Sequence, residues 1–212
     1  IMKKSILAIA VIVLAFTSCK EDKKGKSEVS EKVEVVTQKA VNNVDIENSI
    51  VTWKGNKPTG SHDGTVLLKS GSLSVETGNV KSGEFVVDMT SIINVDMKGS
   101  DGAGNIESHL SGPDFFDVPK FPTAKFVVTS SEVKEGKAHV TGNITIKDTT
   151  KSITIPATVS ETDGVVTFKS DVFKIDRTDF GITYKSKKLD AALKDKFIND
   201  LMEMSFDVKT KK

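Results

Sequence analysis

The chain has little of several residue types that usually reveal a function. Of its 212 residues one is cysteine, one is arginine and 6% are aromatic. A single cysteine excludes a disulfide framework and a cysteine-based zinc cluster. The 30 basic residues nearly balance the 29 acidic ones, and a formal charge of +1 gives no electrostatic reason to bind nucleic acid. Few aromatic rings are present to stack on bases. We therefore exclude nucleic-acid binding and expect no cofactor and no metal.

Recognisable catalytic motifs are also absent from the sequence. It holds no nucleophile elbow, no phosphate-binding loop and no HExxH pair. Ser61, His62 and Asp63 are adjacent, but neighbouring side chains of an extended chain point in opposite directions and cannot form a triad. His109 and His139 lie far from His62 along the chain. We therefore predict that the protein is not an enzyme.

The longest apolar run lies near the start of the sequence. It extends from Ile6 to Phe16 and follows Lys3 and Lys4. As a helix it would be about 16 Å long, too short for a bilayer core of about 30 Å. A basic start, a short apolar run and small residues after it are typical of a secretory signal peptide, which we assign to residues 1–18.

The only cysteine, Cys19, lies directly after this segment. The sequence Ala15-Phe16-Thr17-Ser18-Cys19 resembles the lipoprotein box of Bacteroidetes-type lipoproteins. The resemblance implies a lipid anchor on Cys19 and an exported protein at the outer membrane, on its periplasmic face or at the cell surface. The alternative is an ordinary signal peptide followed by an incidental cysteine.

Residues 19–45 have a different composition from the rest of the chain. Lysine and acidic residues are interspersed there, and aromatic residues are absent. Such a segment buries too little apolar surface to offset the entropy lost on ordering. We interpret it as a flexible tether between a membrane and a domain formed by residues 46–212.

Within residues 46–212 the apolar residues recur with a period of two. Phe85, Val87 and Met89 alternate with polar or smaller residues, and the same pattern recurs around Val140, around Ile153 and near the end of the chain. Such alternation is typical of antiparallel strands with one buried face. Eight to ten such segments, separated by turn residues, predict an all-β sandwich or barrel.

Turn and helix signals subdivide the domain. Glu135-Gly136 and Asp163-Gly164 predict two hairpins. Asn105–Leu110 has the composition of a short helix with Asn105 as its N-cap, preceded by a glycine-rich loop. Ser186–Lys196 is a second irregular stretch, before the last strand.

Three motifs together resemble one known family. They are Asp114-Phe115-Phe116-Asp117, Phe121-Pro122-Thr123-Ala124-Lys125-Phe126 and Ile175-Asp176-Arg177-Thr178-Asp179-Phe180-Gly181. In this order and spacing they resemble the YceI-like family of bacterial exported proteins, from about Val51 to Val208. The resemblance implies an eight-stranded antiparallel lipocalin-like barrel with one or two short helices.

The same resemblance implies a function and partners. Members of the YceI-like family bind long-chain apolar molecules, polyisoprenoids or fatty-acid-type lipids, inside the barrel. We therefore expect non-catalytic binding or transport of such a ligand at the bacterial cell envelope, and the family analogy suggests a homodimer. The alternative is a structural or interaction lipoprotein with a filled barrel, because an eight-stranded barrel is just wide enough either to fill with side chains or to hold one slim ligand.

We choose as candidate ligand contacts residues that alternate onto the inward face of a strand or that are aromatic. For each of them an ordinary core position is the alternative. The candidates are Trp53, Phe85, Val87, Met89, Phe115, Phe116, Phe126, Val128, Val140, Ile144, Ile146, Ile153, Ile155, Met204 and Phe206.

The single arginine, Arg177, has two interpretations. Its guanidinium either ties a strand end to carboxylate or carbonyl groups or, with His109, contacts a polar ligand head.

Overall fold

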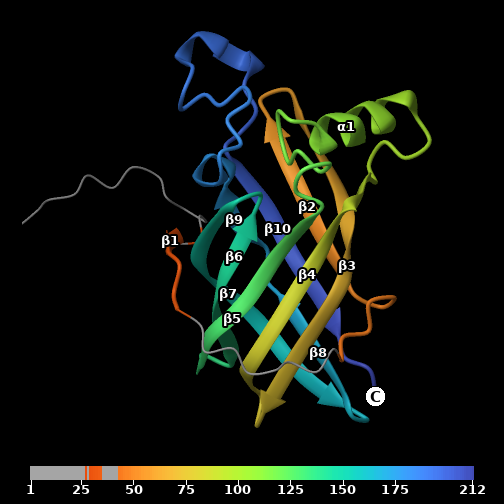
Figure 1. The fold of residues 1–212 in the computed structure, drawn as a ribbon, viewed down its shortest axis with the longest axis vertical. Helices are drawn as coiled ribbons and strands as arrows, with labels where there is room; N and C mark the ends of the chain where they lie inside the picture. The colour runs from red at the N-terminus through yellow and green to blue at the C-terminus, as the bar shows by residue number, and fades with distance from the viewer. Residues whose placement is uncertain (1–26, 28, 35–42) are drawn as a thin grey trace, which may run out of the picture.

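The computed structural model describes residues 27, 29–34 and 43–212 and contains ten strands within them (Figure 1). In long strands such as β4 and β6, buried residues alternate with more exposed ones, as expected for a strand with one face in the core. They are β1 (Val29–Glu31), β2 (Ile50–Lys57), β3 (Gly60–Glu76), β4 (Asn79–Asn94), β5 (Thr123–Lys134), β6 (Lys137–Ile146), β7 (Thr149–Thr162), β8 (Val165–Ser170), β9 (Phe173–Asp176) and β10 (Leu201–Lys209).

Eight of these strands close into an antiparallel barrel. The hydrogen-bonded order is β7-β6-β5-β4-β3-β2-β10-β8, and pairing between β7 and β8 completes the circle. The remaining two strands lie outside this path: β9 pairs with β10, and β1 pairs with β7. The predicted all-β, lipocalin-like barrel is therefore confirmed.

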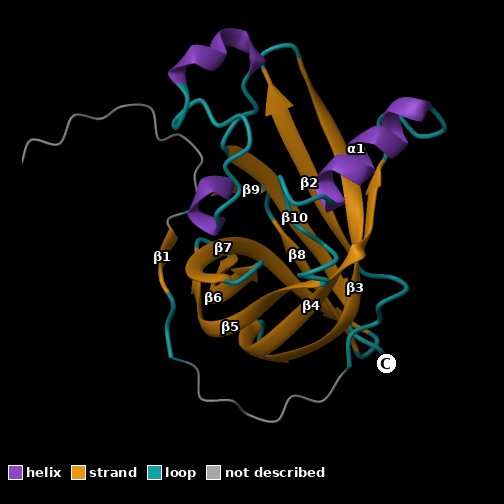
Figure 2. Ribbon diagram, turned by 45° about the horizontal axis from the view of Figure 1, so that its top comes forward, coloured by secondary structure: helices purple, strands orange, loops and turns teal. Residues whose placement is uncertain are grey.

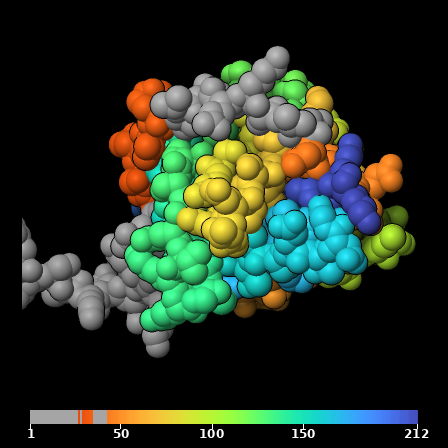
Figure 3. All heavy atoms as spheres, turned by 90° about the horizontal axis from the view of Figure 1, so that it is seen from below, coloured from red at the N-terminus to blue at the C-terminus, as the bar shows by residue number. Residues whose placement is uncertain are grey.

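Tight turns join neighbouring strands at one end of the barrel. At Glu135-Gly136 and Asp163-Gly164 both residues have positive φ, and Thr77-Gly78 repeats the pattern. Two consecutive positive φ angles are typical of the hairpin turn whose twist matches that of the strands. Both predicted hairpins are thus confirmed. Figure 3 views this end, where the yellow β3–β4, green β5–β6 and cyan β7–β8 hairpins lie side by side.

Helical segments lie at the opposite end of the barrel (Figure 2). α1 (Asp101–Ser111) follows β4, and two short 3-10 helices, η1 (Arg177–Phe180) and η2 (Ala191–Lys196), follow β9. The predicted start of the first helix was wrong, because α1 begins at Asp101 and Ser100 is its N-cap. A chain of turns leads into it: Met97 N–H donates to the Asn94 side chain and Ala103 N–H donates to Ser100 O.

Aromatic rings fill the barrel near the hairpin end. Phe85 lies 5.7 Å from both Phe168 and Phe206 and 6.3 Å from Phe126, measured between ring centroids. Gly142 makes room for this cluster, because a Cβ at that position would collide with the Phe126 ring. This half of the barrel is therefore a packed core.

The N-terminal part of the chain contributes more to the fold than its composition predicts. Val44 is 1% exposed, and its N–H donates to Gly71 O, so the domain includes residues before 46. Val29–Glu31, within the segment expected to be a tether, forms a strand on β7. The expected signal peptide and Cys19 lie outside the described residues. No helix in the described part of the chain is long and apolar enough to span a membrane.

Candidate functional site

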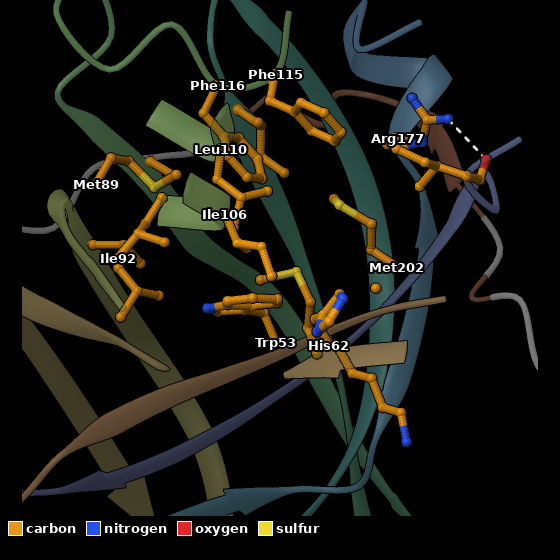
Figure 4. A pocket seen from close by; sticks show the side chains of 18 of the residues that line it. Trp53, His62, Met89, Ile92, Ile106, Leu110, Phe115, Phe116, Arg177 and Met202 are labelled. Carbon is orange, nitrogen blue, oxygen red and sulfur yellow. Dashed lines mark hydrogen bonds between the residues drawn. The ribbon is translucent and has the colours of Figure 1, made fainter. Parts of the chain in front are cut away.

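The barrel contains an apolar cavity of about 260 Å³ beneath α1 (Figure 4). Its walls come from β2 to β6 and from β10, and α1 with the segment after it covers one side. The rings of Phe126 and Phe206 line it and also belong to the aromatic cluster, so they form its floor. The barrel is therefore filled in one half and open in the other.

The cavity brings together ten of the candidate ligand contacts. They come from five strands and from the segment after α1: Trp53, Val87, Met89, Phe115, Phe116, Phe126, Ile144, Ile146, Met204 and Phe206.

Five other candidates do not line the cavity. Their side chains are buried in the barrel interior outside it: Phe85, Val128, Val140, Ile153 and Ile155. They face inward as expected, but other parts of the interior surround them. Alternation determines which face of the sheet a side chain occupies and not which part of the interior it reaches.

Several lining residues were not among the sequence candidates. Ile106 and Leu110 lie on one face of α1, and their spacing of four residues is the signal that could have identified them. Val66 and Ile92 lie on β3 and β4, whose pairing contains register shifts. Met202, on β10, is half-buried and points toward the cavity (Figure 4).

α1 and the segment after it are held to the barrel by specific bonds. The Glu107 carboxylate accepts from Asn94 N–H at 2.8 Å, which ties the helix to the end of β4. Phe115 is buried, and its ring lies edge-on to His109 at 5.0 Å between centroids. His109 also meets the Tyr184 ring at 4.8 Å. Phe116 is half-buried, and both phenylalanines line the cavity.

Trp53 forms part of the wall on β2 (Figure 4). Its indole lies against Gly64 on the neighbouring strand, where a Cβ would clash both with the ring and with the Ile93 carbonyl. Gly64 is therefore the residue that lets the indole lie against the wall. The buried indole Nε1 has no hydrogen-bond partner among the described residues.

Arg177 is fully buried directly after β9, where it lines the cavity and also bonds the protein itself. Its guanidinium donates to the carbonyls of Asn199 at 3.1 Å, Ile182 at 2.9 Å and Ile198 at 2.9 Å, and to the Asp200 carboxylate at 3.2 Å. Burial lowers the pKa of the guanidinium, and the charges of Asp200 and Asp176 oppose that shift. These contacts favour the first interpretation of Arg177, a tie between segments.

A polar cluster lies at the rim of the cavity, where His62 is a lining residue. Its Nδ1 is 3.0 Å from Oδ2 of Asp96, and the other carboxylate oxygen accepts from Asp63 N–H and the Asn94 side chain. Burial raises the pKa of Asp96, but the hydrogen bonds from Asp63, His62 and Asn94 outweigh it and lower the pKa to about 2. Asp96 is therefore ionised at neutral pH and fixes the orientation of the imidazole.

The other polar residues that line the cavity come from several elements. Lys54, Asn56 and Lys57 lie at the end of β2, Lys125 on β5, and Asn199 before β10. The two head-group candidates, His109 on α1 and Arg177 after β9, line it as well. Over residues 27, 29–34 and 43–212, no group of three or more histidine, cysteine, aspartate or glutamate residues could hold a metal ion. The arrangement suits an elongated apolar molecule with a polar end at the rim.

An antiparallel eight-stranded barrel with an apolar cavity at one end defines a lipocalin-like protein. The YceI-like domain model matches residues 42–210, and the chain belongs to this family. A UPF0312 protein of Shewanella denitrificans is 37% identical over 93 residues, covering 43% of this chain and 46% of the relative. One of Pseudomonas syringae pv. tomato is 47% identical over 53 residues, covering 24% and 28%. The matched segments thus span less than half of each relative.

Solved structures share the fold at low sequence identity. BcnA of Burkholderia cenocepacia has a TM-score of 0.64 at 21% identity, covering 80% of this chain and all of that one. A structure described as a polyisoprenoid-binding domain of Saccharophagus degradans has a TM-score of 0.59 at 13% identity, covering 82% and 99%. A YceI protein of Campylobacter jejuni has a TM-score of 0.51 at 19% identity, covering 92% and 99%.

Replacing Arg177 with lysine tests its assignment as a tie. Lysine keeps the charge but cannot reach the same acceptors, so buried carbonyls lose their donors. We expect the free energy of unfolding to fall by about 3 kcal/mol in urea denaturation. Lys169→Arg, on an exposed side chain, is the control and should change stability by less than about 0.5 kcal/mol. Unchanged stability together with lost ligand binding would instead identify Arg177 as a head-group contact.

Proposed function

We propose that the protein binds a long-chain apolar molecule, a polyisoprenoid or fatty-acid-type lipid, in the barrel without catalysing a reaction on it. The observation that carries the proposal is the apolar cavity of about 260 Å³ under α1. A natural barrel core is close-packed, so space of this size between aliphatic and aromatic side chains is a feature to be explained. Transfer of each ligand methylene from water to such walls contributes about 0.8 kcal/mol.

The distribution of polar groups determines how such a ligand lies. Most side chains that line the cavity are aliphatic or aromatic, and the polar ones include His62, Lys57 and Asn199 at the rim. An uncharged tail therefore enters the cavity and a polar head stays at the rim, because an unpaired polar group inside would be destabilising. The description of the Saccharophagus degradans structure as polyisoprenoid-binding supports this ligand class.

The alternative function, a structural module with a filled barrel, accounts for only half of the interior. The aromatic cluster fills the hairpin end, but the cavity under α1 would then have no role. Ligand binding accounts for both halves, because the cluster provides the floor on which the tail ends. The homodimer suggested by the family analogy stays a prediction.

Met202→Trp tests the ligand site directly. Met202 is half-buried and points toward the cavity, so an indole there should occupy the space of the tail (Figure 4). We expect at least about tenfold weaker binding of the fluorescent fatty acid cis-parinaric acid, measured by titration. Leu67→Trp, at a position 49% exposed, adds the same ring elsewhere and should leave binding unchanged. Equal affinity of parent and Met202→Trp would contradict the proposal.

We further propose that the protein acts at the cell envelope, anchored through lipid on Cys19. The support is the lipoprotein-like sequence before Cys19 and the apolar ligand, which is concentrated in membranes. The anchor would place the barrel beside its ligand, whether it stores or transports it.

Cys19→Ser tests the anchor in cells. The variant should move from the membrane fraction to the soluble fraction, because its lipid attachment site is lost. Ser18→Ala keeps a small residue before the cysteine and should remain in the membrane fraction. A parent protein that is itself found in the soluble fraction would show that the anchor is absent.

A further inference from the structure

The barrel wall has a seam between β7 and β9. β7 pairs with β8 only through Ala157–Thr162, and β9 pairs with β10. No pairing joins β7 to β9 among the described residues. The first half of β7 and one edge of β9 therefore flank the seam without backbone pairing to each other. Unpaired strand edges of this kind readily accept another strand.

Residues 27 and 29–34, which we call the strap, contact both sides of this seam. Val29–Glu31 pairs antiparallel with β7, with Val29 opposite Ile153. On the other side Ser27 N–H donates to the carbonyl of Lys174 in β9 at 2.9 Å. The strap therefore bonds both edges. Figure 1 shows β1 at the side of the barrel.

Asn143 holds the far end of the strap. Its side chain accepts from Val33 N–H at 2.9 Å and donates to Val33 O at 2.6 Å, as a neighbouring peptide group would. By alternation Asn143 lies on the outer face of β6, between the inward Gly142 and Ile144, yet it is only 8% exposed. The outer face of β6 thus has a built polar site for the strap.

The seam lies between two walls of the cavity. On one side Ile144, a lining residue of β6, is opposite Lys151 of β7. On the other side Met202, a lining residue of β10, is opposite Ile175 of β9. Each edge of the seam is therefore one strand away from the ligand space.

The strap is attached more weakly than the elements that cover the barrel end. It contributes one partly buried apolar side chain to the core, Val29, and Glu31, which pairs with Lys151 at 2.7 Å, is 87% exposed. Exposed ion pairs and short edge strands contribute little stability. α1, in contrast, is joined through Glu107 and packs Ile106 and Leu110 over the cavity. The strap also lies outside residues 42–210, which match the family.

We propose that the strap is a detachable strand that closes a lateral entrance to the cavity, and that its release lets an apolar chain pass between β7 and β9. This inference rests on the proposed ligand-binding function. Ile153 and Ile175, on the two strands that flank the seam, are 1% and 0% exposed and belong to the barrel core. When the strap leaves, the two strand edges are unpaired and can separate, which gives a long chain a route from the side.

A disulfide across the strap tests this inference. Ser30 and Ser152 are directly opposite, and such positions lie about 4.5–5.5 Å apart between Cα atoms, within the range a disulfide spans. In the full-length Cys19→Ser protein, Ser30→Cys with Ser152→Cys fixes the strap when oxidised. We expect cis-parinaric acid to be released into lipid vesicles about tenfold more slowly in the oxidised than in the reduced form.

A second disulfide is the matched control. Ser74 and Ser82 are opposite each other on β3 and β4. Oxidation of Ser74→Cys with Ser82→Cys should leave release unchanged. Equal release from both forms of the strap variant would overturn the lateral entrance while leaving ligand binding intact. Failure of every variant and of the parent to bind the fatty acid would instead overturn the proposed function, and this inference with it.

Asn143→Ala is an independent variant that requires no new bond. It removes both hydrogen bonds to Val33 and should release the fatty acid about threefold faster or more. Thr141→Ala, on the same face of β6, removes a hydroxyl that contacts Thr154 instead and should not change the rate. Release from Asn143→Ala at the parent rate would show that the strap does not control passage.

Discussion

The open end of this barrel depends on one buried guanidinium. Arg177 joins three carbonyls and one carboxylate that belong to two separate segments, and its charged centre also lies 5.8 Å from the Phe115 ring. A buried charge is tolerated only when its donors are satisfied, so the surrounding backbone must stay in place. The segment before β10 and the turn after β9 are thereby held around the cavity without side chains filling it.

The same barrel combines two kinds of interior. Near the hairpin turns, five phenylalanines in contact pack as a core, and near α1 a cavity remains between aliphatic and aromatic walls. Stability can come from the packed half, which leaves the other half free to bind a ligand. In the proposed binding mode, the polar rim around His62 limits how far a polar head enters. The proposed function needs this division, because an interior that is packed throughout has no room for a tail.

The sequence predicts the fold better than the site, and the reason is physical. Alternation identifies Val140 and Ile144 as inward residues of one strand, and both are buried, but only Ile144 lines the cavity. The difference depends on which part of the interior each side chain reaches, which long-range register determines. The pairing of His62 with Asp96 spans 34 positions and follows from the register of β3 on β4. The strand β1 within the strap was not predicted, because its three residues of mixed polarity contain no strand signal until an unpaired edge is available.

The central claim is that the half of the barrel under α1 binds a lipid. Native mass spectrometry of the purified protein, alone and after exposure to fatty acids and prenols of increasing length, tests it most directly. The account predicts one lipid per chain, retained under gentle conditions and lost on collisional activation, with a preference that depends on tail length. A single ligand-free mass with every lipid offered would contradict it.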